Sequence, residues 1–163
     1  MPDNRTLIAY VTKGGATEEY AFEIASVLRD KYGLDLDVID LRKDKSPDVS
    51  KYRNIIVGSG VRMFKVYKEA VKFIEKNSFD GKRVALFLSS GKAGNPKTYG
   101  EAIEDYINKQ ILNKNPRLKP IAAEAFGGRT RILGREMDPP GYTDQVKIKV
   151  RAWAEQLGKQ LAE

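Results

Sequence analysis

The chain has 163 residues, of which 41% are hydrophobic, enough for one domain (1–163) with a substantial core and too few for two typical domains. It contains no cysteine and no histidine. This excludes disulfides, zinc–thiolate and iron–sulfur sites, thiolate nucleophiles, imidazole metal ligands and the Ser-His-Asp triad. Any chemistry must come from carboxylates, Lys, Arg, Tyr, hydroxyls or a bound cofactor, and no metal site is expected.

The charge is strongly basic, with 29 Lys plus Arg against 22 Asp plus Glu, a net charge of +7. A basic surface favours acidic partners, nucleic acid or anionic lipid. The cations are spread over every segment and mix with acids, as in residues 42–45, so an ordinary solvated surface is the plainer interpretation. No apolar run could span a bilayer, and residues 1–5 do not resemble a signal peptide. We therefore expect a soluble, cytoplasmic protein without stable membrane insertion.

Short apolar runs alternate with helical spacing along the whole chain. Such runs predict strands, and the 3.6-residue spacing predicts helices, in a βαβ succession that folds into a doubly wound parallel sheet. The predicted strands are 6–11, 34–39, 54–58, 83–88 and 120–126, and the predicted helices are 15–32, 64–77, 96–111 and a closing helix over 146–161. The charged stretch 41–52 is predicted to be a loop with at most a short helix, and a long Gly- and Arg-containing loop precedes the closing helix.

Apolar residues on one face of each predicted helix are expected to face the core. These residues are Ala21, Ile24, Ala25 and Leu28; Val66, Ala70, Val71 and Ile74; Ala102, Ile103, Tyr106 and Ile107; and Val146, Val150, Trp153, Ala154, Leu157 and Leu161.

The junction after the first predicted strand is the most informative stretch. It reads Thr12-Lys13-Gly14-Gly15-Ala16-Thr17. A strand–loop–helix junction of this kind points backbone N–H groups and the positive end of a helix dipole at one spot, which suits a phosphate. The loop has neither the dinucleotide pattern G-x-G-x-x-G nor the nucleoside triphosphate pattern G-x-x-x-x-G-K-[ST]. An ordinary strand–helix turn is the alternative.

This loop resembles the [ST]-x-[ST]-G-x-T loop of the flavodoxin family, which holds the phosphate of FMN. Gly14 stands where the family has a hydroxyl and Ala16 where it usually has Asn, and Lys13 supplies charge instead. The resemblance runs from Leu7 to about Leu161. It implies FMN as cofactor and an α/β fold, a three-layer, doubly wound, five-stranded parallel sheet with strand order 2-1-3-4-5. Ligands of such sheets lie outside the carboxyl ends of the strands.

Two further loops fall at that edge. The residues implied as cofactor contacts are Ser59, Gly60, Val61, Arg62 and Met63 in the second loop, and Ser89, Ser90, Gly91 and Lys92 in the third. By resemblance, the Ser59-Gly60 peptide reaches the flavin N5, and the third loop contacts the pyrimidine edge. A tight turn without a ligand is the alternative for the second loop. Tyr99 is the candidate aromatic that stacks on the flavin, with Met63 and Phe64 as rivals; an ordinary half-buried tyrosine is the alternative.

The second loop is also similar to the flavodoxin-domain branch that includes menaquinone-dependent protoporphyrinogen oxidase. Residues 127–131 are polar where that branch has an extended hydrophobic segment. The leading hypothesis is an FMN-binding, soluble, low-potential electron-transfer protein without a catalytic acid or base. Its partners would be redox proteins such as ferredoxin or oxidoreductases that are acidic at the docking face. The alternative is an FMN-dependent oxidoreductase of the protoporphyrinogen dehydrogenase or quinone reductase type, in which Arg62, Arg129 and Arg131 bind substrate carboxylates.

Cations at the cofactor end have a predicted consequence for the flavin. Lys13, Arg62, Lys92 and Arg129 all fall on loops at that edge. Because cations favour the anionic reduced flavin, the second-electron potential should be less negative than in acidic flavodoxins. Three other functions of proteins with this sheet order do not fit the sequence. Response-regulator receivers need acidic residues at 10–12 and 56–58, and tyrosine phosphatases need a cysteine, which this chain lacks. Binding of nucleic acid would need a clustered stripe of cations, and the cations here are dispersed.

Overall fold

Five parallel strands form the central sheet of the computed structural model, which describes residues 5–128, 130–132, 135–137 and 144–162. Across the sheet the strands follow the order β2-β1-β3-β5-β6. Their bounds are β1 Thr6–Val11, β2 Leu36–Asp40, β3 Asn54–Arg62, β5 Arg83–Ser90 and β6 Ala122–Gly127. Counted along the chain as five strands, this is the order 2-1-3-4-5, so the predicted fold class is confirmed.

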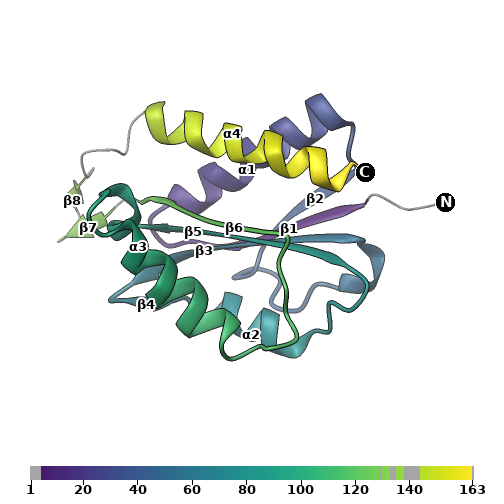
Figure 1. Cartoon of the computed structure of the whole chain (residues 1–163), viewed down its shortest axis with the longest axis horizontal. Coiled ribbons are helices and arrows are strands. Elements are labelled where there is room, and N and C mark those ends of the chain that lie inside the picture. Colours follow the sequence, from purple (N-terminus) through teal and green to yellow (C-terminus); the bar gives the residue numbers. More distant parts are fainter. Residues whose placement is uncertain (1–4, 129, 133–134, 138–143, 163) are drawn as a thin grey trace.

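Helices cover both faces of the sheet (Figure 1). Helices α1 (Ala16–Tyr32) and α4 (Asp144–Leu161) lie side by side on one face. Helices α2 (Lys68–Lys76) and α3 (Tyr99–Ala102) lie on the other, where α3 continues directly into the π-helical segment η3 (Ile103–Leu112). None of the helices in the described ranges combines the length and apolarity needed to cross a membrane.

Strand β1 shows why the sheet is buried on both faces. All six of its residues are buried. Because neighbouring side chains of a strand point to opposite faces, Ile8 and Tyr10 pack with α1 and α4, whereas Leu7, Ala9 and Val11 pack with α2 and η3. A parallel strand covered by helices on both sides needs this continuous apolar run.

The predicted inward faces of the helices are confirmed. Every position expected to face the core in α1 and α4 is buried, and in the other helices only Val71 and Ile103 are half-buried. Trp153 of α4 lies between two sheet residues, with ring centroids 6.2 Å from Phe87 and 5.9 Å from Phe126. Aromatic pairs in such tilted arrangements anchor a core.

The region after β3 differs from the prediction. The strand was expected to end at residue 58, but it continues to Arg62 and turns back into a short antiparallel strand, β4 (Lys65–Val66). Helix α2 therefore begins at Lys68, four residues later than expected. Val66 is buried as predicted, but it belongs to β4. Helical spacing and a short buried strand cannot be told apart over so few residues.

Smaller differences concern the other connections. The helix expected over 96–111 spans 99–112, and most of it is π-helical, as shown by the bond of 2.8 Å from the N–H of Asn113 to the carbonyl of Asn108. The expected long loop after β6 contains a separate hairpin, β7 (Thr130–Ile132) and β8 (Arg135–Met137). The short helix allowed in the charged loop is present as η1 (Val49–Lys51).

Candidate functional site

The loop after β1 ends in a helix N-terminus that faces the carboxyl edge of the sheet. Gly15 adopts the left-handed conformation, with φ of 95°, and helix α1 begins at the next residue. The N–H of Gly15 donates a hydrogen bond of 2.9 Å to Oγ1 of Thr12, and this bond fixes the turn. The first bond of the helix ladder runs from Glu19 to the carbonyl of Gly15. The preceding N–H groups, those of residues 16–18, therefore have no partner in the helix and are donors for an anion.

The first turn of α1 also carries carboxylates. Glu18 and Glu19 lie in this turn, where they interact favourably with the helix dipole. Glu18 is engaged with Tyr10 at the end of β1: burial, followed by the charges of Glu18 and Asp40, raises the pKa of Tyr10 to about 12. The cation that the sequence offers to balance an anion here is Lys13, which is exposed.

Thr17 joins the first loop to the other two. Its hydroxyl is 2.6 Å from the hydroxyl of Ser89, and both side chains are buried. A Cβ added to Gly60 would lie 3.4 Å from Oγ1 of Thr17. The structure therefore brings residues from all three predicted loops together around one buried threonine, although Gly60 and Ser89 belong to the ends of β3 and β5 and not to the loops that follow them.

The second loop is an extension of β3. The hydroxyl of Ser59 donates to the carbonyl of Gly60 at 2.7 Å and accepts from the N–H of Tyr67 at 3.3 Å. A Cβ on Gly60 would lie 2.9 Å from the ring of Tyr67, so only glycine lets the ring approach this closely. Val61 pairs with Val66 in the hairpin.

Tyr67 is a site residue that the sequence did not indicate. Its ring borders Gly60, and the Nζ of Lys13 lies 5.1 Å from the ring centroid, a cation–π contact. Burial raises the pKa of Tyr67, although Arg62 and Arg42 oppose the shift. It was missed because residues 64–77 were expected to be helical. The turn that places it lacks the Asn and Gly typical of two-residue hairpins, so no local signal marks it.

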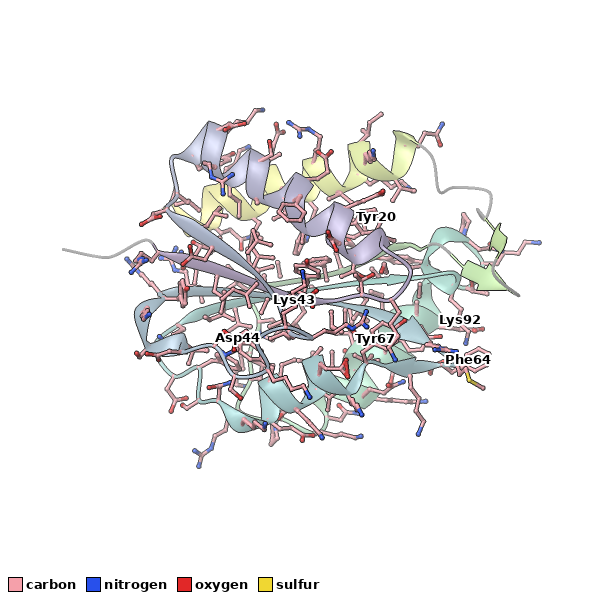
Figure 2. The ribbon with its side chains drawn as sticks, turned by 180° about the vertical axis from the view of Figure 1, so that it is seen from behind. Tyr20, Lys43, Asp44, Phe64, Tyr67 and Lys92 are labelled. Atoms are coloured by element: carbon pink, nitrogen blue, oxygen red, sulfur yellow. The ribbon has the colours of Figure 1, made fainter. Side chains whose placement is uncertain are left out.

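The third loop places its cation away from the first. Ser90 accepts the N–H of Ala93 at 3.3 Å. The Nζ of Lys92 lies 3.4 Å from Glu101 and 3.5 Å from Asp105, and 5.1 Å from the ring centroid of Phe64. Figure 2 shows Phe64 and Lys92 beside each other near the end of the molecule, with Tyr67 farther in.

Tyr99 is also placed away from the meeting point of the loops. Its hydroxyl donates to the carboxylate of Glu124 on β6, which also accepts the N–H of Ala125 at 2.9 Å. Burial, followed by Glu124, raises the pKa of Tyr99 to about 12. The structure thus directs Tyr99 to the outer edge of the sheet and does not bring it to Gly60.

The remaining predicted residues divide into two groups. Gly14 and Gly91 lie on the converging loops, whereas Arg62 and Met63 stand at an exposed hairpin tip. Arg129 lies outside the described residues, and of Arg131 only the backbone in β7 is described.

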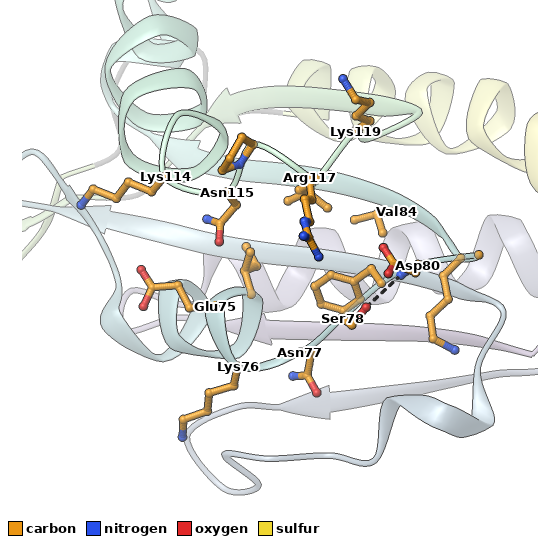
Figure 3. A pocket seen from close by; sticks show the side chains of 16 residues that line it. Glu75, Lys76, Asn77, Ser78, Asp80, Val84, Lys114, Asn115, Arg117 and Lys119 are labelled. Atoms are coloured by element: carbon orange, nitrogen blue, oxygen red, sulfur yellow. Dashed lines mark hydrogen bonds between the residues drawn. The ribbon is translucent and has the colours of Figure 1, made fainter.

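Two sizeable cavities lie elsewhere on the molecule. One of 730 Å³ borders β6 and α4 and includes Tyr99 and Trp153 in its wall. Another, of 630 Å³, lies at the amino ends of the strands, between the end of α2 and residues 114–119 (Figure 3). Figure 3 shows Arg117 reaching from that loop toward the turn of Ser78 and Asp80. The latter cavity is at the opposite end of the sheet from Thr17.

The donors at the carboxyl edge suit a phosphate monoester. They are backbone N–H groups at the start of a 17-residue helix, the hydroxyls of Thr12 and Thr17, and the ammonium of Lys13. Hydroxyl and main-chain donors at a helix N-terminus bind phosphate without an arginine cluster. The polar side of the site therefore fits a phosphate-bearing ligand.

Comparison with known proteins identifies the same family that the sequence resembles. The family model described as the flavodoxin domain matches residues 7–135. Protoporphyrinogen IX dehydrogenase [quinone] of Escherichia coli K12 is 24% identical over 115 residues, which cover 69% of this chain and 63% of that protein. The matched part thus spans less than two thirds of this curated relative.

Solved structures agree on the fold. Oxidised Flavodoxin 2 from Bacillus cereus superposes with a TM-score of 0.69 at 19% identity, covering 96% of this chain and 99% of that one. Oxidised Flavodoxin 1 from the same organism gives 0.63 at 21% identity, covering 95% and 97%. Because the family model spans most of the chain and the sheet has the expected order, this chain belongs to the flavodoxin-domain family.

Proposed function

We propose that the protein binds FMN and carries electrons between redox partners. The observation that carries the proposal is the meeting of the start of α1 with the ends of β3 and β5 at Thr17, whose hydroxyl contacts Ser89 and lies beside Gly60. In a doubly wound sheet this edge is where a cofactor binds. Membership of the flavodoxin-domain family supports FMN over other phosphate-bearing ligands.

Each part of the site has a distinct task in this proposal. Thr12, Lys13 and the N–H groups of residues 16–18 would hold the phosphate, with Gly14 and Ala16 keeping the loop narrow. Ser59 and Gly60 would border the flavin on one side and Ser89 to Gly91 on the other. Tyr67, which already lies against Gly60, would be the neighbouring aromatic ring.

The bound flavin would supply reversible one- and two-electron chemistry. The chain's own residues would orient the ring, exclude water from it through the buried Ser59 and Ser89, and set the local charge. No proton-transfer residue is required. The net charge of +7 supports acidic partners, since opposite charges speed encounter.

Titration of the apo-protein with FMN tests the proposal, read as quenching of flavin fluorescence. Riboflavin, which lacks the phosphate, should bind much more weakly if the helix N-terminus holds that group. Thr17→Val should weaken FMN binding about tenfold, the loss of one hydrogen bond to a charged group. Thr6→Val removes an equally buried threonine at the other end of the sheet and should leave FMN binding unchanged. Equal affinities for FMN and riboflavin would contradict the proposed phosphate site.

A second candidate is an FMN-dependent oxidoreductase. The observation that favours it is the likeness to a protein named protoporphyrinogen IX dehydrogenase [quinone]. Anaerobic mixing of the FMN-loaded protein with protoporphyrinogen IX, and separately with reduced ferredoxin, distinguishes the two functions. Rapid bleaching of the flavin by protoporphyrinogen would support the enzyme, and bleaching by ferredoxin alone would support the carrier.

A further inference from the structure

The hairpin between β3 and β4 has an unfavourable turn. Met63 and Phe64 are the non-glycine residues with positive φ in the described chain, at 51° and 64°. Two-residue hairpins need this left-handed geometry and normally use Asn and Gly for it. Bulky residues held there cost free energy, and such strain is concentrated at functional sites. The sequence therefore keeps two large side chains where the backbone disfavours them.

The same two side chains are not part of the core. Met63 is 82% exposed and Phe64 is 69% exposed. They contribute little to burial in the folded chain, so packing does not explain them.

The two residues that flank the turn, Arg62 and Lys65, also form an unfavourable pair of like charges. Arg62 and Lys65 lie directly opposite each other in the antiparallel register, and like charges in such pairs are destabilising. Both are exposed, and neither has an ion-pair partner within the ranges that the structure describes. Two cations beside two exposed apolar side chains make a surface that opposite charges can complement.

Gln110 holds this hairpin in place from segment η3. Its side-chain amide donates to the carbonyl of Phe64 at 2.9 Å, and its carbonyl oxygen accepts the N–H of Val66 at 2.9 Å. These bonds satisfy two backbone groups next to the turn and fix its direction. These bonds hold the tip at the carboxyl end of β3, the edge at which the cofactor is proposed to bind.

We propose that the tip of the β3–β4 hairpin, residues 62–65, docks an acidic redox protein, with Met63 and Phe64 contacting an apolar spot on the partner and Arg62 and Lys65 pairing with carboxylates around it. This inference rests on the proposed electron-carrier function and adds the surface at which the partner binds. Gln110 acts as a positioning residue for that surface.

An anionic membrane fits this surface less well than an acidic protein. The apolar part consists of two side chains, whereas stable attachment to a bilayer needs a larger apolar area or a second anchor. Phe64 also lies beside Lys92, whose charge is balanced by Glu101 and Asp105. This leaves Arg62 and Lys65 as the cations of the tip, fewer than the cluster of about four to eight that binds anionic lipid.

The test uses a plant-type [2Fe–2S] ferredoxin as the acidic probe. Calorimetry at low ionic strength gives the Kd of its complex with the full chain, and stopped-flow gives the rate at which reduced ferredoxin reduces the bound FMN. The variant M63N/F64G replaces the turn by Asn-Gly. It should raise the melting temperature, because the backbone is relieved, while weakening the complex about tenfold, as loss of a central apolar contact does. K65E should also weaken the complex and reduce its dependence on salt.

Matched controls are available on other surfaces. I148S removes an apolar side chain of similar exposure, 65%, from helix α4. K114E makes the same charge change at the opposite end of the sheet. Both should leave the Kd for ferredoxin unchanged.

Three outcomes would overturn the docking proposal. One is an unchanged ferredoxin Kd in both M63N/F64G and K65E. Another is a lower melting temperature in M63N/F64G, which would assign the tip to the fold. The third is binding to phosphatidylserine vesicles that M63N/F64G abolishes while the ferredoxin Kd stays the same.

FMN titration and reduction by photoreduced 5-deazariboflavin, an uncharged donor, are measured in parallel. If M63N/F64G weakens FMN binding in proportion to the loss of ferredoxin reduction, the tip belongs to the cofactor site and the docking proposal fails. If the wild-type chain binds no FMN, the proposed function fails, and the calorimetric Kd alone still decides the docking surface.

Discussion

At the carboxyl ends of the strands, buried hydroxyls and a glycine bring the start of α1 into direct contact with the ends of β3 and β5, whereas at the amino ends basic side chains surround an open cavity. The first region is organised by Thr17 and Ser89, which are 2.6 Å apart. The second is a space of 630 Å³ whose wall includes Lys76, Lys114 and Arg117. At one end of the sheet the polar groups are in direct contact, and at the other end the charged groups are separated by open space.

This difference determines whether side-chain volume or ionic strength decides the effect of a substitution at each end. Where atoms touch, an added methyl group must displace a neighbour, so volume decides the effect of a substitution. Where exposed charges face each other across water, volume matters little and ionic strength decides it. Similar changes made at the two ends of the sheet test this contrast.

The largest effect is expected from an added methyl group on β3. A Cβ at Gly58 would lie 2.1 Å from the ring of Phe87, which is fully buried. Gly58→Ala should therefore lower the free energy of unfolding by about 3 kcal/mol, the upper range for overpacking a core. Gly81, at the amino end, has φ of 77° and open space around it, so Gly81→Ala should cost only the backbone strain, about 1 kcal/mol. Urea unfolding of both variants checks the difference, and equal costs would contradict it.

The interior of the fold was predictable because its local signals agree. The run over residues 6–11 is apolar throughout, and the 3.6-residue spacing of α1 and α4 identified their buried faces correctly. In such elements, propensity, pattern and burial lead to the same structure. The meeting of Thr17, Gly60 and Ser89 was predictable for a related reason, since parallel strands bring their carboxyl ends to one edge of the sheet.

The surface features of the site were not predictable in this way. The turn at Met63 and Phe64 breaks the hairpin rule, so the strand β4 and the placement of Tyr67 had no local signal. Tyr99 and Lys92 were placed by resemblance, but carboxylates on other secondary-structure elements fix their directions: Glu124 for Tyr99, and Glu101 with Asp105 for Lys92. Contacts of this kind depend on tertiary structure.

Alkaline pH should destabilise both ends of the sheet. Burial and nearby carboxylates raise the pKa of Tyr10, at the carboxyl end, and of Tyr52, at the amino end, to about 12. Because the folded pKa is above the unfolded value of 10.0, the contribution to stability is complete below pH 10 and is lost as the pH rises toward 12. After allowance for solvent screening, each tyrosine should account for about 1 kcal/mol of this loss.

The urea midpoint measured from pH 9 to 12, with tyrosinate absorbance followed in parallel, checks this expectation. Tyr52→Phe removes the bond of 2.6 Å to Asp37 and should flatten the decline, as should Tyr10→Phe. A decline that is the same in the wild type and both variants would show that other groups cause it.

Lys13 should tune the flavin if FMN binds as proposed. Its ammonium is exposed and lies over Tyr67, whereas Lys92 is already paired with two carboxylates. Removing the charge by Lys13→Ala should make the second-electron potential more negative by about 20 mV, or about 0.5 kcal/mol, as expected for a solvent-screened charge. Potentiometric titration of the bound flavin measures this shift. Lys114→Ala, at the far end of the sheet, serves as the control and should leave the potential unchanged.

The smallest effect is expected at the amino-end cavity. The residues of this wall include more cations than carboxylates: Lys76, Lys82, Lys114, Arg117 and Lys119 against Glu75 and Asp80. Within the described part of the chain, Lys114 and Arg117 have no ion-pair partner. Lys114→Glu should therefore relieve repulsion and raise the free energy of unfolding by about 0.3 kcal/mol at low salt.

The salt dependence of that gain is the sharper measurement. Because exposed charges are screened beyond roughly 10 Å at moderate ionic strength, the advantage of Lys114→Glu should vanish when salt is added. The cost of Gly58→Ala, which arises from atomic overlap with Phe87, should persist under the same conditions. If the cost of Gly58→Ala changed with salt, or the gain of Lys114→Glu did not, atomic contact would not dominate at the carboxyl end of the sheet and charge would not dominate at the amino end.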